Sequence, residues 1–106
     1  MPADPVRARQ VLTAPNAITL VALHDGVVVG FAAAMSDGAI DMYLSTLVVA
    51  ADQRRKHVAT DLLAALFQAT GVERIGLLAE PGSEAFYDSL PHRTFAGYRL
   101  YAQSGE

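Results

Sequence analysis

The stretch LVVAADQRRKHVATDLLAAL, residues 47–66, decides the fold because the spacing of its apolar residues changes partway along. Up to Val49 the chain is apolar and β-branched, which is typical of a buried strand. From Val58 onward, apolar residues recur at helical spacing and form one stripe on a helix. The turn between the two elements carries three basic residues: Arg54, Arg55 and Lys56. The stretch therefore predicts a strand, a basic loop and an amphipathic helix.

Two further strands precede the strand that ends at Val49. The runs 17–23, 27–35 and 39–49 are all rich in apolar, β-branched or aromatic residues. Asp-Gly pairs at residues 25–26 and 37–38 separate these runs. Because Asp-Gly favours the positive φ angles of a tight hairpin turn, the pattern predicts an antiparallel three-stranded meander.

The residues after the helix predict the second half of a mixed α/β fold. Gly71 is a typical helix C-cap, and residues 73–79 read as a strand parallel to the third one in a right-handed βαβ unit. Pro81 opens a short second helix over residues 81–90, and residues 94–102 read as a C-terminal strand. The expected fold class is thus α/β, with one mixed sheet and two helices.

Length and composition indicate a single globular domain. The 106 residues are 52% hydrophobic and 18% charged, which suits one packed core and excludes extensive disorder. Residues 1–16 contain three prolines and are expected to form an arm before the domain, residues 17–106. The sequence has no cysteine, no secretory signal pattern and no apolar run near the roughly 20 residues that cross a bilayer. These features favour a cytoplasmic protein without a membrane partner.

The basic triplet, residues 54–56, predicts a local anion site. A net charge of −3 argues against general affinity for nucleic acid. Yet three of the eight Lys and Arg residues stand together at a helix start, where the positive end of the helix disfavours cations. A bound phosphate or pyrophosphate removes this conflict, because free N–H groups and guanidinium groups both bind it. The alternative is a solvated turn, with Asp52 capping an earlier helix start.

Residues 47–66 also resemble the acetyl-coenzyme A (acetyl-CoA) signature of the GNAT superfamily of N-acetyltransferases, an apolar L-x-V followed by Q/R-x-x-G-x-G/A. Arg54 and Ala59 match this signature, whereas His57 replaces its first glycine, a residue that lets the backbone approach phosphate closely. The resemblance implies that the cofactor-binding residues are Leu47, Val48, Val49, Arg54, Arg55, Lys56, His57, Val58, Ala59 and Thr60.

The segment AEPGSEAFYDSL, residues 79–90, resembles the second signature of that family, a short helix that carries Phe-Tyr. Tyr87 matches the family tyrosine that commonly lies beside the thioester sulfur. Glu80 stands where many members have asparagine, and Pro91-His92 replaces the usual Gly-Phe. The family's first strand and helical pair are also reduced, which leaves the acceptor side open.

The resemblance implies direct attack of an amine on the thioester of acetyl-CoA, with no metal and no covalent enzyme intermediate. Backbone groups of residues 47–49 would hold the pantetheine arm and stabilise the oxyanion. Tyr87 is the candidate acid for the leaving thiolate, because its hydroxyl has an ordinary pKa of about 10; the alternative is a core aromatic. Asp41 is the candidate base, although a structural carboxylate is the simpler interpretation. His24 and His92 receive no role.

Three functions follow from these patterns. We expect an N-acetyltransferase that moves an acetyl group to an amine of a small molecule or a protein, with a homodimer as one way to complete its pocket. A non-catalytic, CoA-binding interaction or regulatory module is the alternative, motivated by His57, Glu80 and the short N-terminus. A structural dimer module without a nucleotide site is the third.

Overall fold

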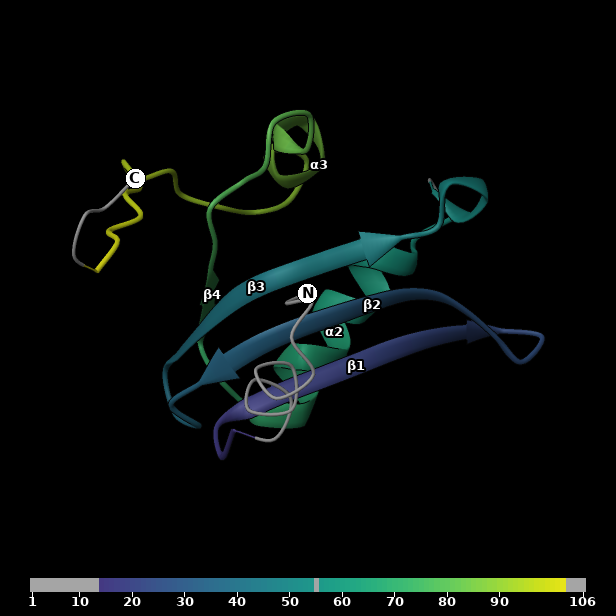
Figure 1. Ribbon diagram of the computed structural model, residues 1–106, viewed down its shortest axis with the longest axis horizontal. Coiled ribbons are helices and arrows are strands. Elements are labelled where there is room, and N and C mark those ends of the chain that lie inside the picture. Colours follow the sequence, from purple (N-terminus) through teal and green to yellow (C-terminus); the bar gives the residue numbers. More distant parts are fainter. Residues whose placement is uncertain (1–13, 55, 103–106) are drawn as a thin grey trace.

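The computed structural model describes residues 14–54 and 56–102, so the expected N-terminal arm lies almost entirely outside the described residues. One four-stranded sheet has the order β1-β2-β3-β4, with antiparallel pairing from β1 to β3 and parallel pairing of β4 with β3 (Figure 1). The mixed α/β fold is therefore confirmed. The elements are β1 Ala17–His24, β2 Val27–Ser36, β3 Asp41–Val49, the 3-10 turn η1 Ala51–Gln53, α2 Val58–Thr70, β4 Arg74–Gly76 and α3 Glu84–Asp88.

Turn chemistry sets the two hairpins of the meander. Asp25 and Gly26 both have positive φ, at 51° and 78°, as a two-residue hairpin turn requires. The second connection is longer than expected, because Asp37 Oδ1 accepts hydrogen bonds from the backbone N–H groups of residues 39–41 at 2.8 to 3.1 Å. These bonds lower the pKa of Asp37 and stabilise the loop. β3 therefore begins at Asp41, two residues later than the expected start at residue 39.

The core lies between α2 and one face of the meander (Figure 1). β2 presents small buried residues to the helix, Ala32 and Ala34, and so lets the helix lie close to the sheet. α2 fills that space with leucines, of which Leu66 is completely buried. The helix ends as expected at Gly71, whose φ is 70° and whose N–H donates to Phe67 O.

Gly30 fixes how closely the start of α2 approaches β2. A Cβ at this position would lie 3.0 Å from Val48 O and 3.0 Å from Val58 Cγ1. Both contacts are tighter than ordinary van der Waals packing. The absence of a side chain therefore lets the first turn of the helix rest directly on the sheet, next to the end of β3.

The region after α2 differs from the sequence-based expectation. β4 is paired over three residues, although a strand was expected over residues 73–79. The second helix, α3, is also shorter than the expected residues 81–90. No strand forms within residues 94–102, so the prediction of a C-terminal strand is wrong. The pattern of that segment suits a strand, but a strand needs a neighbour, and the described sheet ends at β4.

Candidate active site

A gap in strand pairing opens the sheet between β3 and β4. The parallel pairs run from Asp41 opposite Arg74 to Tyr43 opposite Gly76, and then stop. The rest of β3 is paired with β2 on its other side, while residues 77–80 lead away toward α3 (Figure 1). The strands thus separate, and the β4-facing edge of residues 47–49 has no strand partner in the described chain.

A β-bulge in β3 changes which residues face α2. Leu44 pairs with Ala34 and Thr46 pairs with Ala33, so Ser45 is an extra residue with no partner in β2. Its hydroxyl donates to Ala33 O at 2.9 Å. Because of the bulge, Leu47 packs against the core after Leu44, and the alternation along β3 shifts by one residue.

The start of α2 presents backbone donors without intrahelical acceptors. The first helical hydrogen bond runs from Asp61 N–H to His57 O at 2.9 Å, and His57 makes no side-chain capping bond. The N–H groups of residues 58–60 therefore find no backbone or side-chain acceptor among the described residues. Free donors at the positive end of a helix are suited to binding an anion.

His57 adopts the backbone conformation that a glycine adopts easily. Its φ of 65° and ψ of 14° lie in the left-handed region, which is strained for a residue with a Cβ. This is the position where the family signature has its first glycine. The loop therefore keeps a left-handed turn into α2 although the residue has changed, and the His57 side chain is exposed.

The basic residues around this turn point in different directions. Arg54 Nε donates to Val49 O at 3.4 Å, which places its guanidinium at the end of β3. Lys56 is exposed and lines a cleft on the β1 side of the helix start. Arg55 lies outside the described residues. The alternative in which Asp52 caps the helix is not supported, because Asp52 belongs to η1 and α2 begins only at Val58.

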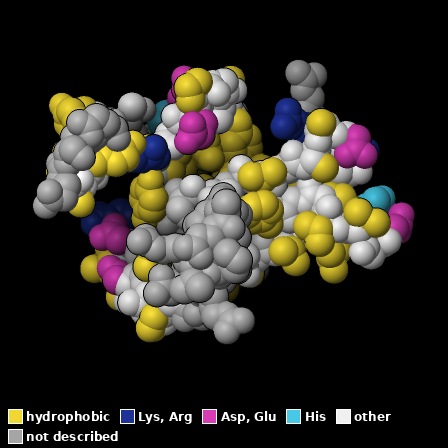
Figure 2. Space-filling model, viewed as in Figure 1, with side chains coloured by type: hydrophobic (Ala, Val, Ile, Leu, Met, Phe, Trp, Pro, Cys, Tyr) yellow, Lys and Arg dark blue, Asp and Glu magenta, His cyan; other side chains and the backbone are white. Residues whose placement is uncertain are grey.

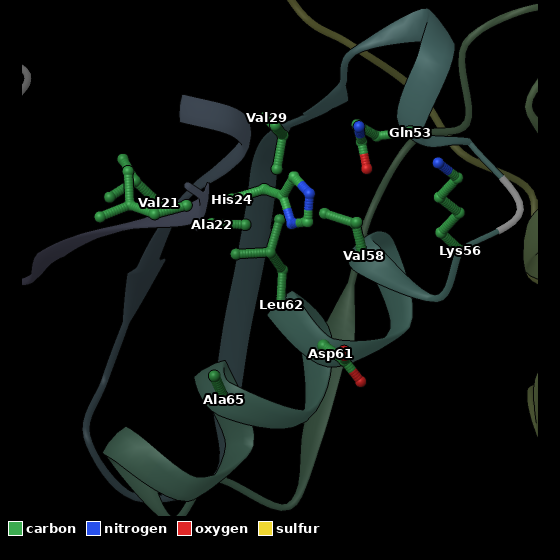
Figure 3. A pocket seen from close by; sticks show the side chains of 11 residues that line it. Val21, Ala22, His24, Val29, Gln53, Lys56, Val58, Asp61, Leu62 and Ala65 are labelled. Carbon is green, nitrogen blue, oxygen red and sulfur yellow. The ribbon is translucent and has the colours of Figure 1, made fainter. Parts of the chain in front are cut away.

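The cleft beside Lys56 was not expected from the sequence. It has a volume of ≈ 480 Å³ and lies between the β1–β2 hairpin and the first turns of α2 (Figure 3). The His24 ring points toward Val58 and Leu62, and Gln53 lies on the opposite rim (Figure 3). No sequence motif links these residues, because the hairpin and the helix start are brought together only by the fold.

Tyr87 belongs to α3, and Figure 1 shows α3 above the side of the sheet where β3 and β4 separate. Phe86, its neighbour, packs against the core, whereas Tyr87 is half-buried and does not belong to the core cluster. The two rings meet edge to face at 5.0 Å between centroids. Burial raises the pKa of Tyr87 above its ordinary value of 10.0, so the hydroxyl is protonated at neutral pH.

Asp41 is the first residue of β3, at the end of the strand away from Val49. Arg74 Nε donates to Asp41 Oδ1, and Arg74 Nη2 lies 3.4 Å from Asp41 Oδ2. This exposed ion pair joins β3 to β4 where the parallel pairing begins. The ion pair gives Asp41 a structural partner. Asp41 is about six to eight residues along β3 from residues 47–49, which corresponds to a distance on the order of 20 Å or more.

The family comparison agrees with this geometry. The family model described as Acetyltransferase (GNAT) family matches residues 2–90, which is most of the chain. The chain therefore belongs to the GNAT acetyltransferase family, which confirms both the family and the enzyme class, N-acetyltransferase, expected from the sequence. No curated protein matches the chain closely enough to count as a relative.

Solved structures share the fold at low sequence identity. An aminoglycoside N-acetyltransferase, AAC(6')-Iy, in complex with CoA, has a TM-score of 0.75 and 21% identity over 92% of this chain and 84% of its own. An aminoglycoside acetyltransferase, meta-AAC0020, from an uncultured soil metagenomic sample has a TM-score of 0.76 and 20% identity over 98% and 76%. A ribosomal-protein-alanine N-acetyltransferase from Brucella melitensis biovar Abortus 2308 has a TM-score of 0.72 and 19% identity. The match covers 92% of this chain and 78% of that one. At these identities the likeness shows the fold.

Two features of the described residues bear on other functions. None of their helices combines the length and apolar character that crossing a bilayer needs. The same residues contain no group of three His, Asp or Glu side chains that could hold a metal ion.

Proposed function

We propose that this protein transfers an acetyl group from acetyl-CoA to an amine of a small molecule or a protein. The observation that carries the proposal is a pair of backbone groups near the end of β3. The N–H groups of residues 58–60 and the β4-facing edge of residues 47–49 have no backbone partner among the described residues. The first suits a pyrophosphate, and the second suits an amide-containing arm that needs a strand-like partner. Both lie within the segment of the family signature.

Charge and chain geometry support the binding part of the proposal. Arg54 Nε donates to Val49 O, which places the guanidinium at the end of β3, beside the edge of residues 47–49. Its guanidinium can pair with a phosphate oxygen while its backbone stays extended, with φ −67° and ψ 151°. His57 keeps the left-handed turn into α2 that a glycine adopts easily, which supports an anion site at this helix start.

Tyr87 is the residue that we assign to proton transfer. Acetyl-CoA supplies an activated acyl carbon and a thiolate leaving group. When the amine nitrogen bonds to the acyl carbon and the carbon–sulfur bond breaks, the sulfur must take up a proton, and Tyr87 holds one at neutral pH. The amine proton passes to a base or to solvent. The Arg74 pair at the distant end of β3 does not favour Asp41 as that base.

The acceptor is the open part of the proposal. The neighbours' names include a small-molecule class and a ribosomal protein, so structural likeness selects an amine and no particular one. A non-catalytic CoA-binding module would bind acetyl-CoA without turnover on any amine. The retained loop geometry at His57 and the protonated Tyr87 favour the enzyme. A cytoplasmic location stays a prediction from the sequence.

Calorimetric titration with acetyl-CoA tests the proposal, with free adenine nucleotide as the control for simple phosphate affinity. We expect binding that needs the pantetheine arm. Arg54→Ala should weaken it roughly tenfold, because a charge-assisted pair with phosphate is lost. Arg93→Ala is the matched control, since it removes the same charge from an exposed arginine that stacks on Phe95 after α3.

Two results would contradict this assignment. If acetyl-CoA binds no better than the adenine nucleotide, the strand edge does not hold the pantetheine arm. If the Arg54 and Arg93 variants weaken binding equally, the effect is one of total charge and Arg54 does not contact phosphate. A panel of amines with the wild-type protein then separates the enzyme from a binding module.

A further inference from the structure

Large apolar side chains form two rows on one face of the meander. Val21 of β1 pairs with Phe31 of β2, and Phe31 pairs with Val48 of β3, so these three side chains form a row across the sheet. Leu23 and Val28 are paired as well and form a second row toward the β1–β2 turn. We call these five residues the outer apolar patch.

The outer apolar patch lies on the side of the sheet away from α2. Ala32, which follows Phe31, is completely buried in the core beneath α2, and successive side chains of a strand point to opposite faces. In Figure 3, Val21 lies on the other side of β1 from the His24 ring, which points toward α2. Figure 2 looks onto the outer face and shows apolar side chains gathered over the strands near the β1–β2 turn.

The patch is open to solvent and continuous with the proposed acyl-transfer site. Val21, Leu23, Val28 and Val48 are 54%, 62%, 56% and 47% exposed. Contiguous exposed apolar side chains are typical of an interaction site. The first row ends at Val48, which belongs to the strand edge that we propose for the pantetheine arm. A molecule on this patch therefore lies beside that edge.

The same face offers little to a molecule with several positive charges. The next cross-strand row on this face is uncharged and consists of Thr19, Ala33 and Thr46. The carboxylates at the ends of the strands already have partners. Asp25 Oδ2 lies 3.4 Å from His24 Nε2, Asp41 pairs with Arg74, and Asp37 Oδ1 accepts three backbone hydrogen bonds.

We infer that the acceptor is a small primary amine with a single positive charge and an apolar body, which lies on the outer apolar patch. The inference rests on the acetyl transfer proposed above and adds the class of acceptor. Aminoglycosides, a class that the names of two structural neighbours include, carry several ammonium groups. On this face those groups would lose water without gaining a carboxylate, which is unfavourable.

An apolar surface also helps the amine to react. An alkylammonium resembles a lysine side chain, whose ordinary pKa is about 10.4, and apolar surroundings disfavour its charged form. The patch thus favours the neutral amine although Asp41 is paired with Arg74 far along β3. The neutral nitrogen bonds to the acyl carbon, the carbon–sulfur bond breaks, and the sulfur takes the Tyr87 proton. The nitrogen gives one proton to solvent as the amide forms, and solvent returns a proton to Tyr87.

Hexylamine and hexamethylenediamine are matched probes, because they differ only by an ammonium group at the far end. Val48 and Val21 are two strand spacings apart, roughly 10 Å, which is comparable with the length of either molecule. We expect kcat/KM to be about tenfold or more higher for hexylamine, because the far ammonium would lie over an apolar surface. Phenethylamine should be acetylated as hexylamine is, and the aminoglycoside neamine should be a poor acceptor.

Val21→Glu tests where the apolar body lies. A carboxylate at the far end of the row can pair with the second ammonium, so the preference for hexylamine over the diamine should fall by about tenfold. Val27→Glu is the matched control, because Val27 is 62% exposed and pairs with His24 on the α2 side of the same hairpin. This control should keep the wild-type preference, and Val21→Glu should keep the wild-type affinity for acetyl-CoA.

Three results would overturn the inference while the cofactor site stands. Hexamethylenediamine or neamine is acetylated as well as hexylamine, neither hexylamine nor phenethylamine is acetylated, or the two glutamate variants change the preference equally. Calorimetric titration with acetyl-CoA separates these results from a failure of the proposed function. If acetyl-CoA does not bind, the proposed function is wrong, and the acceptor inference that rests on it is wrong as well.

Discussion

The meander with α2 and the region after β4 are built in different ways. All buried hydrophobic side chains of the described residues lie between Val29 and Val72. The region after β4 contributes half-buried contacts, such as Phe86 and Leu90, and ends in an exposed tail. The proposed cofactor site thus rests on the packed part, whereas Tyr87 rests on the loosely packed part. Binding and proton transfer should therefore respond differently to mutation.

The largest expected effect comes from the centre of the packed part. Leu66→Ala should lower the free energy of unfolding by about 2–5 kcal/mol, because it leaves a cavity at a residue with 0% exposure. Leu100→Ala, the same change at 91% exposure, should have little effect on the unfolding of the isolated domain. Urea denaturation measured at low protein concentration compares the two. Equal losses would mean that residues 91–102 are part of the core.

Tyr87→Phe tests the proposed proton transfer in the region after β4. We expect turnover to fall by about 100-fold while acetyl-CoA affinity stays unchanged, because the variant keeps the ring and removes the proton. Burial raises the Tyr87 pKa above 10.0, so the hydroxyl stays protonated up to that pH. Deprotonation of Tyr87 should therefore not reduce wild-type turnover below pH 10.0. The stability linked to this shift is likewise present below the ordinary pKa and lost above the raised one. Equal turnover of variant and wild type would show that Tyr87 is not the proton donor and only packs against its neighbours.

His57→Gly tests the packed part at the turn between β3 and α2. Glycine removes the strain of a left-handed residue but adds chain entropy to the unfolded state, so the free energy of unfolding should rise by no more than about 1 kcal/mol. His57→Ala is the matched control and should not be stabilising, because alanine keeps the strained Cβ. A strong loss of stability in the glycine variant would show that the imidazole makes a contact that the fold needs.

The smallest effect is expected at Asp41. Asp41→Asn removes one partner of an exposed ion pair at the end of β3 away from the proposed site, so turnover should be unchanged and the unfolding midpoint nearly so. Steady-state kinetics against several amines provides the measurement. A large fall in turnover with intact acetyl-CoA affinity would instead support Asp41 as the base.

Much of the local structure around the proposed site could be predicted, because its signals come from adjacent residues. The basic turn, the helix that begins after it and the glycine that ends that helix all follow from adjacent residues. The cleft beside His24 could not be predicted, because it depends on how the β1–β2 hairpin packs against the start of α2. The Arg74 partner of Asp41 also lies beyond sequence reasoning, since the two residues are brought together by the parallel pairing of β3 and β4.

The sequence by itself determined the meander, its first hairpin turn and α2, since turn residues, alternation and helical spacing act within a few residues of each other. Only the tertiary structure decided where β4 ends, that His57 turns left-handed and that residues 94–102 form no strand. The physical reason is that a strand is stabilised by its neighbour, and a residue's backbone angle is imposed by the elements on either side. The sequence pattern shows that residues 94–102 can form a strand. A neighbouring strand must provide the hydrogen bonds that stabilise it.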